Sequence, residues 1–321
     1  KPDFEAPCIR IWHQNDMSLF IGNGLKIGFP IFELDRFTDI EIHHLSYPDK
    51  LLVCSQWAKD IVVKEATGDF VLVMDCHILL CPTVETITRL FKFMEDNPTT
   101  DHLYTGPLVG NDLRDFHTHY NDKWGSHMWG VWGKAWQCPC GYRFSINSLD
   151  DDGLEYVSLV EQDVITACGN CHKELPVMDF SGNEKVLESA GDTQCAKMDK
   201  PFEIFAQGTG CFLVRKEAWL KYNEHASGFG GEECYIHEKY RKSGNKAYCL
   251  PFLKWLHRFG RSEDIQYPAK IEYKLRNYIL EFIELELDLS SIYEHFVKEN
   301  DFDEIVYNSF VREAQYLYNR E

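Results

Sequence analysis

Three short segments carry side chains whose types and spacing suit chemistry on a metal-bound phosphate. The run 66–77 ends on Asp75 and His77, the run 230–233 places two carboxylates after two glycines, and the run 255–258 adds an imidazole and a guanidinium. Oxygen and imidazole ligands of this kind suit Mn²⁺ or Mg²⁺ on a diphosphate. Because the three segments can bind a metal–diphosphate and supply a base, the leading hypothesis is an enzyme that uses a sugar nucleotide.

Asp75 and His77 directly follow an apolar, strand-like run, so both side chains can point out of one sheet edge. A divalent ion there would bridge two phosphates and neutralise the charge that builds on a leaving nucleoside diphosphate. His257 is the candidate third ligand, and Arg258 or Arg261 can pair with phosphate. The alternatives are a surface histidine at 77 and a core histidine at 257.

The segment 230–233 has two interpretations. Its glycines would let the backbone approach a sugar, Glu232 would bind hydroxyl groups, and Glu233 would be the base that deprotonates an acceptor hydroxyl. The alternative is a flexible turn before a helix, whose first-turn carboxylates favour the helix dipole.

Twelve cysteines are present, and four of them form two close pairs, Cys138 with Cys140 and Cys168 with Cys171. Two such pairs supply the four thiolates of a tetrahedral structural zinc site, with His172 as a spare ligand. A redox-active dithiol at Cys168 and Cys171 is the alternative. The other eight cysteines are scattered, which favours a reducing cytoplasm with one metal site over a disulfide-stapled secreted domain.

The composition bounds the function classes. The 321 residues are 44% hydrophobic, enough for one large α/β domain with an insertion and a tail. No apolar run of about 18 residues and no leader-like segment occurs, so we expect neither a membrane span nor a signal peptide. The formal charge of −18 disfavours a polyanionic partner, although residues 238–276 carry ten Lys or Arg against four Asp or Glu, a local +6.

Hydrophobic periodicity predicts alternating strands and helices over roughly the first hundred residues. The expected strands are 8–13, 39–44 and 70–74, and the expected helices are 17–27, 56–66 and 83–95. Such alternation indicates an α/β fold, a mostly parallel sheet flanked by helices, with ligands at the carboxyl ends of strands. The polar residues at those predicted ends are Asn15, His43, His44, Asp75 and His77.

In the later part of the chain, residues 202–214 are strand-like, and a helix is expected from about 268 to 283, followed by two or three short helices. The expected parts are a nucleotide-sugar-binding half (1–124), a cysteine-rich zinc-ribbon-like insertion (125–180), an acceptor half (181–264) and a helical C-terminal extension (265–321).

These residues resemble the nucleotide-sugar glycosyltransferases of the GT-A fold over roughly residues 9–258. The run 66–77 is similar to the strand that ends in that group's metal motif, and its D-x-H form resembles polypeptide N-acetylgalactosaminyltransferases. His257 matches the later histidine that completes the metal site there. The run 207–214 resembles the glycine-rich strand under the donor sugar, and 228–233 resembles the W-G-G-E-N or W-G-G-E-D segment.

The resemblance implies a Rossmann-like GT-A fold and a hexosyl- or N-acetylhexosaminyltransferase that uses Mn²⁺ or Mg²⁺ and a UDP-sugar. His43 and His44 stand where an aspartate usually contacts uracil. The stereochemistry stays open, because the acid at Glu233 is like inverting enzymes whereas D-x-H is like retaining ones. The residues implied at the donor are Asn15, His43, Lys59, Asp75, Gly208, Gly210, Gly231 and Arg258, with Asp75, His77 and His257 on the metal.

The cysteine-rich insertion and the tail from Tyr267 are similar to phage glycosyltransferases encoded near TET-type dioxygenases. That resemblance implies double-stranded DNA carrying a hydroxymethylpyrimidine as partner, 5-hydroxymethylcytosine first, in the host cytoplasm. A protein or glycan hydroxyl is the alternative acceptor. Two other classes remain, a zinc-ribbon nucleic-acid-binding protein with an inactive GT-A domain and a nucleotidyltransferase, although residues 9–16 lack a glycine-rich phosphate loop. The sugar and the oligomeric state stay open.

Overall fold

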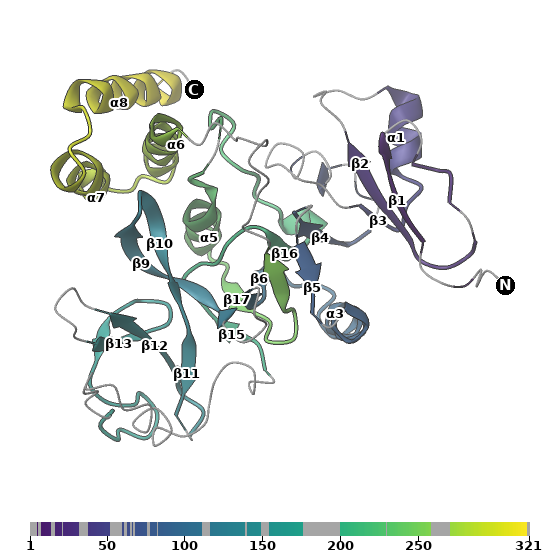
Figure 1. Cartoon of the computed structure of the whole chain (residues 1–321), viewed down its shortest axis with the longest axis horizontal. Coiled ribbons are helices and arrows are strands. Elements are labelled where there is room, and N and C mark those ends of the chain that lie inside the picture. The colour runs from purple at the N-terminus through teal and green to yellow at the C-terminus, as the bar shows by residue number, and fades with distance from the viewer. Residues whose placement is uncertain are drawn as a thin grey trace.

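The computed structural model describes most of the chain, with gaps. Figure 1 shows the N-terminal strands at one end, the C-terminal helices at the other and the central sheet between them. The described residues are 5, 8–13, 17–20, 22–31, 38–51, 60, 63–64, 66, 68–75, 78–81, 83–110, 116–138, 140–148, 154–175, 200–228, 230–257 and 270–319.

A small parallel sheet begins the chain. It has the strand order β1 (Cys8–His13), β2 (Lys26–Ile31), β3 (Lys50–Leu51). The expected helix at 17–27 is wrong, because residues 22–24 form a bend and β2 begins at Lys26. Glycines at 22 and 24 lower helix propensity there, and Gly22 has a φ of 93°.

The expected strand at 39–44 is also wrong, because residues Asp39–Leu45 form helix α1. Thr38 caps the helix by accepting from the Glu41 backbone N–H, while the Glu41 carboxylate accepts from the Thr38 N–H at 2.8 Å. This reciprocal cap outweighs the short alternation of Ile40 and Ile42. His43 and His44 therefore lie on a helix and not at the carboxyl end of a strand.

The central sheet has five strands in the order β15 (Phe202–Glu203), β17 (Ala247–Cys249), β6 (Leu103–Thr105), β16 (Cys211–Arg215), β4 (Phe70–Met74). The predicted strand at 70–74 is confirmed. Its alternate residues face opposite layers, because side chains alternate along a strand. Helix α5 (Glu232–Lys242) packs on the face that includes Val71, Val73, Phe212 and Val214, and helix α3 (Thr83–Asp96) packs on the other face with Tyr104 and Leu213.

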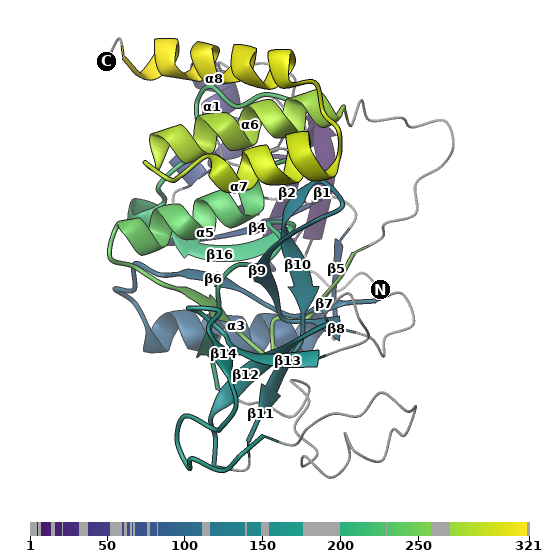
Figure 2. The same cartoon turned by 90° about the vertical axis from the view of Figure 1, so that its left-hand side faces the viewer.

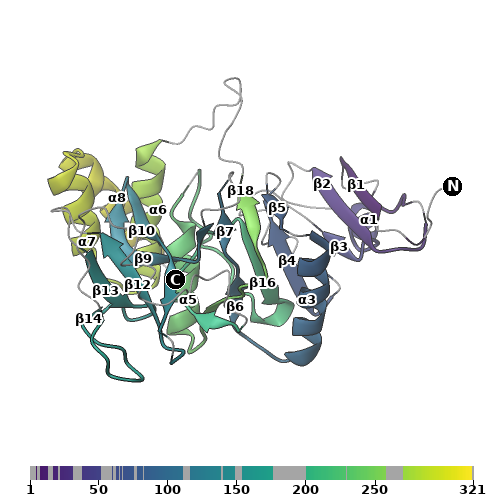
Figure 3. The same cartoon turned by 60° about the horizontal axis from the view of Figure 1, so that its bottom comes forward.

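A second sheet, of four short strands, continues beside β4 and β16 (Figure 3). Its order is β5 (Ile78–Leu80), β18 (Trp255–His257), β7 (Leu108–Val109), β8 (Phe116–His117). Strand β18 is antiparallel to β5 and parallel to β7. The chain thus returns from far downstream to the segment that directly follows Asp75.

The cysteine pairs lie in turns beside a separate antiparallel sheet, which follows a hairpin. The hairpin joins β9 (His119–Gly125) and β10 (Met128–Gly133), so the part boundary expected at 124/125 falls inside it. The sheet that carries the cysteines has the order β11 (Ala135–Gln137), β12 (Arg143–Ser148), β13 (Leu154–Ser158), β14 (Val164–Ile165).

The C-terminal extension is helical, as predicted, and forms a core with the hairpin. Figure 2 shows its helices stacked over α5. Trp124 packs on Tyr278 and Trp129 packs on Phe282. The backbone N–H of Trp129 donates to the Tyr278 hydroxyl at 2.9 Å. The elements are α6 (Ile271–Glu284), α7 (Ser290–Tyr293), a π-helical turn (Glu294–Glu299) and α8 (Glu304–Tyr318), and a short 3₁₀ helix (Lys216–Ala218) lies upstream.

The α/β class is therefore confirmed, with helices on both faces of the central sheet. The sheets are mixed. Parallel pairs join β1 to β2, β2 to β3, β6 to β17 and β7 to β18, and the other described pairs are antiparallel. The predicted helix at 83–95 is confirmed as α3, whereas most of the predicted helix at 56–66 lies outside the described residues.

Candidate functional site

Asp75 lies where β4 ends, held against the strand that was expected under a donor sugar. Strand β16 pairs with β4, with Cys211 opposite Met74, so Gly210 comes beside Asp75. The Asp75 N–H donates to the Gly210 carbonyl at 2.8 Å, and the Ile78 N–H donates to the Asp75 carbonyl at 3.2 Å. The second bond links Asp75 to Ile78, the first residue of β5.

Gly210 has no room for a side chain. A Cβ there would lie 2.8 Å from Ile78 Cδ1, 3.2 Å from the Trp255 ring and 3.3 Å from Asp75 Oδ2. The Asp75 carboxylate therefore lies over the Gly210 backbone, on the side where Trp255 packs. A larger residue at 210 would push into the aspartate, so the glycine keeps this strand end open.

His257 reaches the same place from β18. It is the register partner of Ile78, three residues after Asp75. Trp255 and His257 share one face of β18, because side chains two residues apart point the same way, and their ring centroids are 6.2 Å apart. The Trp255 indole N–H donates to the Gly106 carbonyl at 2.8 Å, which fixes the tryptophan against Gly210. His257 is thus on the face of β18 that looks toward Gly210 and Asp75.

Gly208 is enclosed by aromatic rings. A Cβ there would meet Trp132 at 3.4 Å, the Tyr120 hydroxyl at 3.5 Å and Trp255 at 3.6 Å. Tyr120 and Trp255 are buried, whereas Trp132 is half-buried and comes from the β9–β10 hairpin. Sequence reasoning missed Tyr120 and Trp132, although a cluster of tryptophans after residue 124 was a visible signal.

The two adjacent glutamates begin α5. Gly231 caps the helix with a φ of 116°, a conformation that favours glycine, and Glu232 and Glu233 form the first turn. Glu232 Oε2 is buried and has no hydrogen-bond partner among the described residues. The Glu233 carbonyl accepts from the His237 imidazole N–H at 2.6 Å.

Tyr222 connects Glu232 with the Asp75 edge. Burial raises the pKa of Tyr222 well above its usual value, and the negative charges of Glu232, Asp60 and Asp75 raise it further. The charges of Glu232 and Asp75 therefore both act on the Tyr222 hydroxyl. Glu233 instead heads the charges that raise the pKa of buried Tyr120 and Tyr278, after burial itself. Glu232 also raises the pKa of Tyr120, by less than Glu233 does, so the two adjacent carboxylates share neighbours.

Helix α6 holds the glycine loop, which sequence reasoning did not foresee. The Asn277 amide donates to the Gly230 carbonyl at 2.8 Å and accepts from the Ser227 N–H at 3.0 Å. A Cβ at Gly231 would lie 2.9 Å from Glu281 Oε2 and 3.1 Å from Asn277 Cβ. Asn277 and Glu281 are 1% and 2% exposed, so polar residues four apart in a buried helix face were the available signal.

Glu281 is a buried carboxyl near three others. Burial raises its pKa well above the usual range, and the charges of Glu232, Glu233 and Glu284 raise it further, against the opposing effect of Lys239. Burial and the neighbouring carboxylates both favour the neutral form of Glu281, because the neutral form carries the smaller desolvation cost.

The four paired cysteines meet, as their spacing predicted. The Sγ atoms of Cys138, Cys140, Cys168 and Cys171 all lie within 4.8 Å of one another, with 3.7 Å between 138 and 171 and 3.3 Å between 140 and 168. A zinc–sulfur bond of about 2.3 Å implies tetrahedral edges of about 3.8 Å, so these thiols fit one ion. The Cys171 N–H also donates to Cys168 Sγ at 3.5 Å. His172 is not in this group.

The other predicted site residues are either exposed or outside the described residues. His43 is exposed on α1. Asn15, Lys59, His77 and Arg258 lie outside the described residues, so their predicted roles stay predictions. Among the described residues, the four cysteines are the one group of three or more potential ligands close enough to hold an ion.

Comparisons with known proteins show a distant structural likeness. No protein-family model matches the chain, and no characterised protein matches it in sequence. Among solved structures, it is similar to a crystal structure of GalNAc-T7 with UDP, GalNAc and Mn²⁺, at 14% identity and a TM-score of 0.42. The match covers 90% of this chain and 50% of that one, so the chain spans about half the length of GalNAc-T7. A likeness at this level establishes neither family nor activity.

No described helix combines the length and the apolar character that crossing a membrane requires.

Proposed function

We propose that the chain is a metal-dependent glycosyltransferase that moves a sugar from a nucleotide-sugar, a UDP-sugar first, to a hydroxyl. The observations that support the proposal are the hydrogen bond from Asp75 to Gly210 and the pairing of His257 with Ile78, three residues after Asp75. Oxygen and imidazole donors together suit Mn²⁺ or Mg²⁺.

In this proposal Asp75 and His257, with His77, hold the ion and the donor diphosphate. The ion, when bound, neutralises the charge that develops on the leaving nucleoside diphosphate. The Asp75 N–H bond to Gly210 holds the backbone of the aspartate at the end of β4. Arg258 pairs with phosphate, and Asn15, His43 and Lys59 stay predicted contacts of the nucleotide.

Glu232 and Glu233 divide the remaining work. Glu232 has a buried, unpartnered carboxylate oxygen in the neighbourhood of Asp75, which suits it to accept hydrogen bonds from sugar hydroxyls. Glu233 is the candidate base that takes the proton of the acceptor hydroxyl. Gly208, Gly210 and Gly231 stay predicted donor contacts, and in the described structure the Cβ position of each lies against side chains of the chain itself.

The four cysteines are proposed to hold a structural zinc ion. All four thiols are available and close together, and a closed set of four ligands leaves no open position for catalysis. The ion would fix the two cysteine turns to each other.

The acceptor is the least defined part of the proposal. The resemblance to phage enzymes implied 5-hydroxymethylcytosine in DNA, with a protein or glycan hydroxyl as the alternative. Nothing in the described residues supports the DNA acceptor. One assay separates the acceptors: incubation with Mn²⁺ and a panel of nucleotide sugars, with hydroxymethylated DNA, a peptide or an oligosaccharide, followed by mass spectrometry.

The test of the activity itself is Asp75→Ala. The variant should lose sugar transfer and donor hydrolysis while it unfolds at the wild-type urea midpoint, because Asp75 is at a strand end and not in the core. Unchanged turnover would refute the metal assignment. Metal-dependent thermal stabilisation by the donor would separate an active transferase from an inactive domain that binds nucleic acid.

A further inference from the structure

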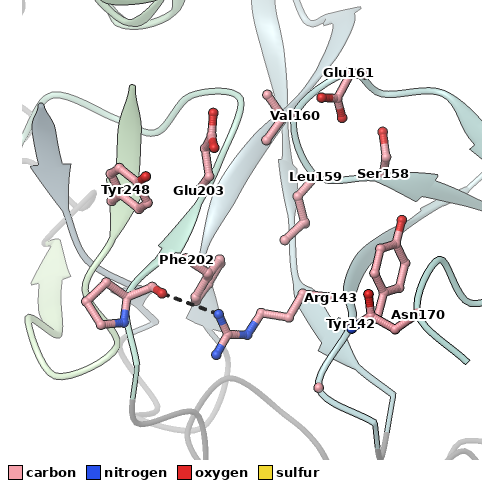
Figure 4. Close-up of a pocket in the computed structure, with 12 residues that line it drawn as sticks. Tyr142, Arg143, Ser158, Leu159, Val160, Glu161, Asn170, Phe202, Glu203 and Tyr248 are labelled. Atoms are coloured by element: carbon pink, nitrogen blue, oxygen red, sulfur yellow. Dashed lines mark hydrogen bonds between the residues drawn. The ribbon is translucent and has the colours of Figure 1, made fainter. Parts of the chain in front are cut away.

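A groove of about 390 Å³ lies between the cysteine-bearing sheet and the edge of the central sheet (Figure 4). One wall of the groove comes from the cysteine turns, with Tyr142 and Asn170, and the other wall comes from β15 and β17, with Glu203 and Tyr248. The rim comes from the end of β13 and the turn after it, with Ser158 and Glu161. Because β15 and β4 are opposite edges of the sheet, four strand spacings of about 4.8 Å separate these two strands by roughly 19 Å. The groove is a different place from the candidate site.

Two tyrosine rings face the groove from opposite walls, and both are held in position (Figure 4). Tyr248 is stacked on buried Tyr104, with ring centroids 5.8 Å apart and planes at 23°. Tyr142 packs on the second cysteine turn so closely that a Cβ at Gly169 would lie 2.6 Å from its ring. Both rings are half-buried. The groove therefore offers two rigid, partly exposed aromatic surfaces.

The floor is apolar and already covered by a cation. Phe202 is buried, and the Arg143 guanidinium lies 4.9 Å from its ring centroid. Arg143 also donates to the Pro201 carbonyl at 3.4 Å, the dashed line in Figure 4, and to Gln137 Oε1 at 3.1 Å. These two bonds and the contact with Phe202 hold Arg143 against the floor of the groove.

The charges at the groove cancel. Glu203 is paired with Lys246 at 2.6 Å, and Glu161 is exposed at the rim. The two negative charges of these carboxylates are therefore balanced by the two positive charges of Arg143 and Lys246. A polyanion or a strongly basic peptide would meet as much repulsion as attraction, whereas a neutral ligand would not. The remaining groups at the rim are a hydroxyl and a carboxamide, from Ser158 and Asn170.

We propose that this groove binds a neutral sugar chain. The apolar faces of the sugar rings would stack on Tyr142 and Tyr248, and sugar hydroxyls would donate to the carboxylates of Glu161 and Glu203. The binding itself stands on the groove alone. Its role in holding the acceptor of the transfer reaction rests on the proposed function, and it would make a glycan the acceptor class.

Saturation-transfer NMR with triacetylchitotriose and maltotriose, without donor or metal, tests the proposal on the full chain. At least one neutral probe should bind at millimolar concentration, and Tyr248→Ala should weaken it about five-fold or more. Tyr316→Ala removes an exposed tyrosine from α8 and is the matched control. Glu161→Ala, at an exposed rim position, should also weaken binding, and it covers the case in which Tyr248→Ala does not fold.

Ionic strength distinguishes the ligand classes. Affinity for the neutral probe should change less than about two-fold between low and high salt, since no net charge is involved. Asp75→Ala should bind the probe as wild type does, so a failed transferase and a failed groove give different results. Absence of binding for both probes overturns the proposal. Salt-sensitive binding of single-stranded DNA that Tyr248→Ala abolishes would also overturn it, in favour of nucleic acid.

Discussion

Replacing Asn277 with alanine should disturb the candidate site from a helix that lies outside the resembling region. The change removes the amide that bridges the Gly230 carbonyl and the Ser227 N–H, at 2.8 and 3.0 Å, in a site that is 1% exposed. Leaving a buried polar group without its partner costs about 1–3 kcal/mol, and two are affected. With partial relaxation we expect a loss of roughly 2–4 kcal/mol in the free energy of unfolding.

The loss should reach activity as well as stability. The bridge holds Gly230, one residue before the positive-φ Gly231 that caps α5, so its removal should loosen Glu232 and Glu233 and lower kcat more than it raises KM. Urea unfolding and steady-state kinetics measure the two effects. Asn308→Ala, an exposed asparagine on α8, has the same gain in helix propensity and is the control. If Asn277→Ala and Asn308→Ala have the same urea midpoint and the same kcat, the hydrogen bonds of Asn277 have no role.

Three further predictions address separate parts of the molecule. Gly210→Ala should lower the rate of sugar transfer at least about ten-fold, because its Cβ would press against Ile78 and Asp75. Gly68→Ala, whose Cβ would meet one atom at 3.6 Å, is the control and should keep wild-type activity in the same kinetic assay. Equal activities of the two variants would contradict the close contact at Gly210. Cys140→Ser should lower the zinc content measured by elemental analysis, and Cys81→Ser, outside the cluster, should not; equal zinc in both would remove the four-thiol site. Burial lowers the pKa of His119 to about 4, so between about pH 6.5 and 4 the unfolded state binds more protons than the folded state, and the free energy of unfolding falls by about 2 kcal/mol near pH 5. The difference in urea stability between wild type and His119→Gln should therefore shrink by about that amount from pH 7 to pH 5. A difference that does not change with pH would contradict the assignment.

Residue patterns were sufficient where burial follows a regular period. Strand β4 is a continuous apolar run and α3 repeats its apolar residues at helical spacing, and both elements are found where expected. The cysteine group was also accessible from the sequence, because two close pairs leave few ways to satisfy four thiols. These features depend on local pattern alone.

The errors have local causes. At 39–44 the alternation of Ile40 and Ile42 suggested a strand, but Thr38 and Glu41 form a capping box, and Ile40 is 68% exposed and contributes little packing. Weighing the cap above a two-residue alternation would have given the helix.

Other features could not be read from the sequence. The contacts of Asn277 and Glu281 with the glycine loop depend on how α6 docks on the start of α5, across about 50 positions of chain. The groove likewise depends on the placement of the cysteine-bearing sheet beside β15 and β17. Such contacts are set by tertiary packing and leave only a weak trace, a polar residue in a buried helix face.

Electron paramagnetic resonance of Mn²⁺, titrated in the presence of UDP, tests the central claim most directly, because it reports the ion itself and needs no acceptor. Wild type should bind the Mn²⁺–UDP complex, Asp75→Asn and His257→Ala should each weaken it by at least about ten-fold, and His172→Ala, an exposed histidine beside the cysteines, should leave it unchanged. Wild-type affinity in both Asp75→Asn and His257→Ala would show that these residues do not share an ion, and the proposed transferase would lose its basis.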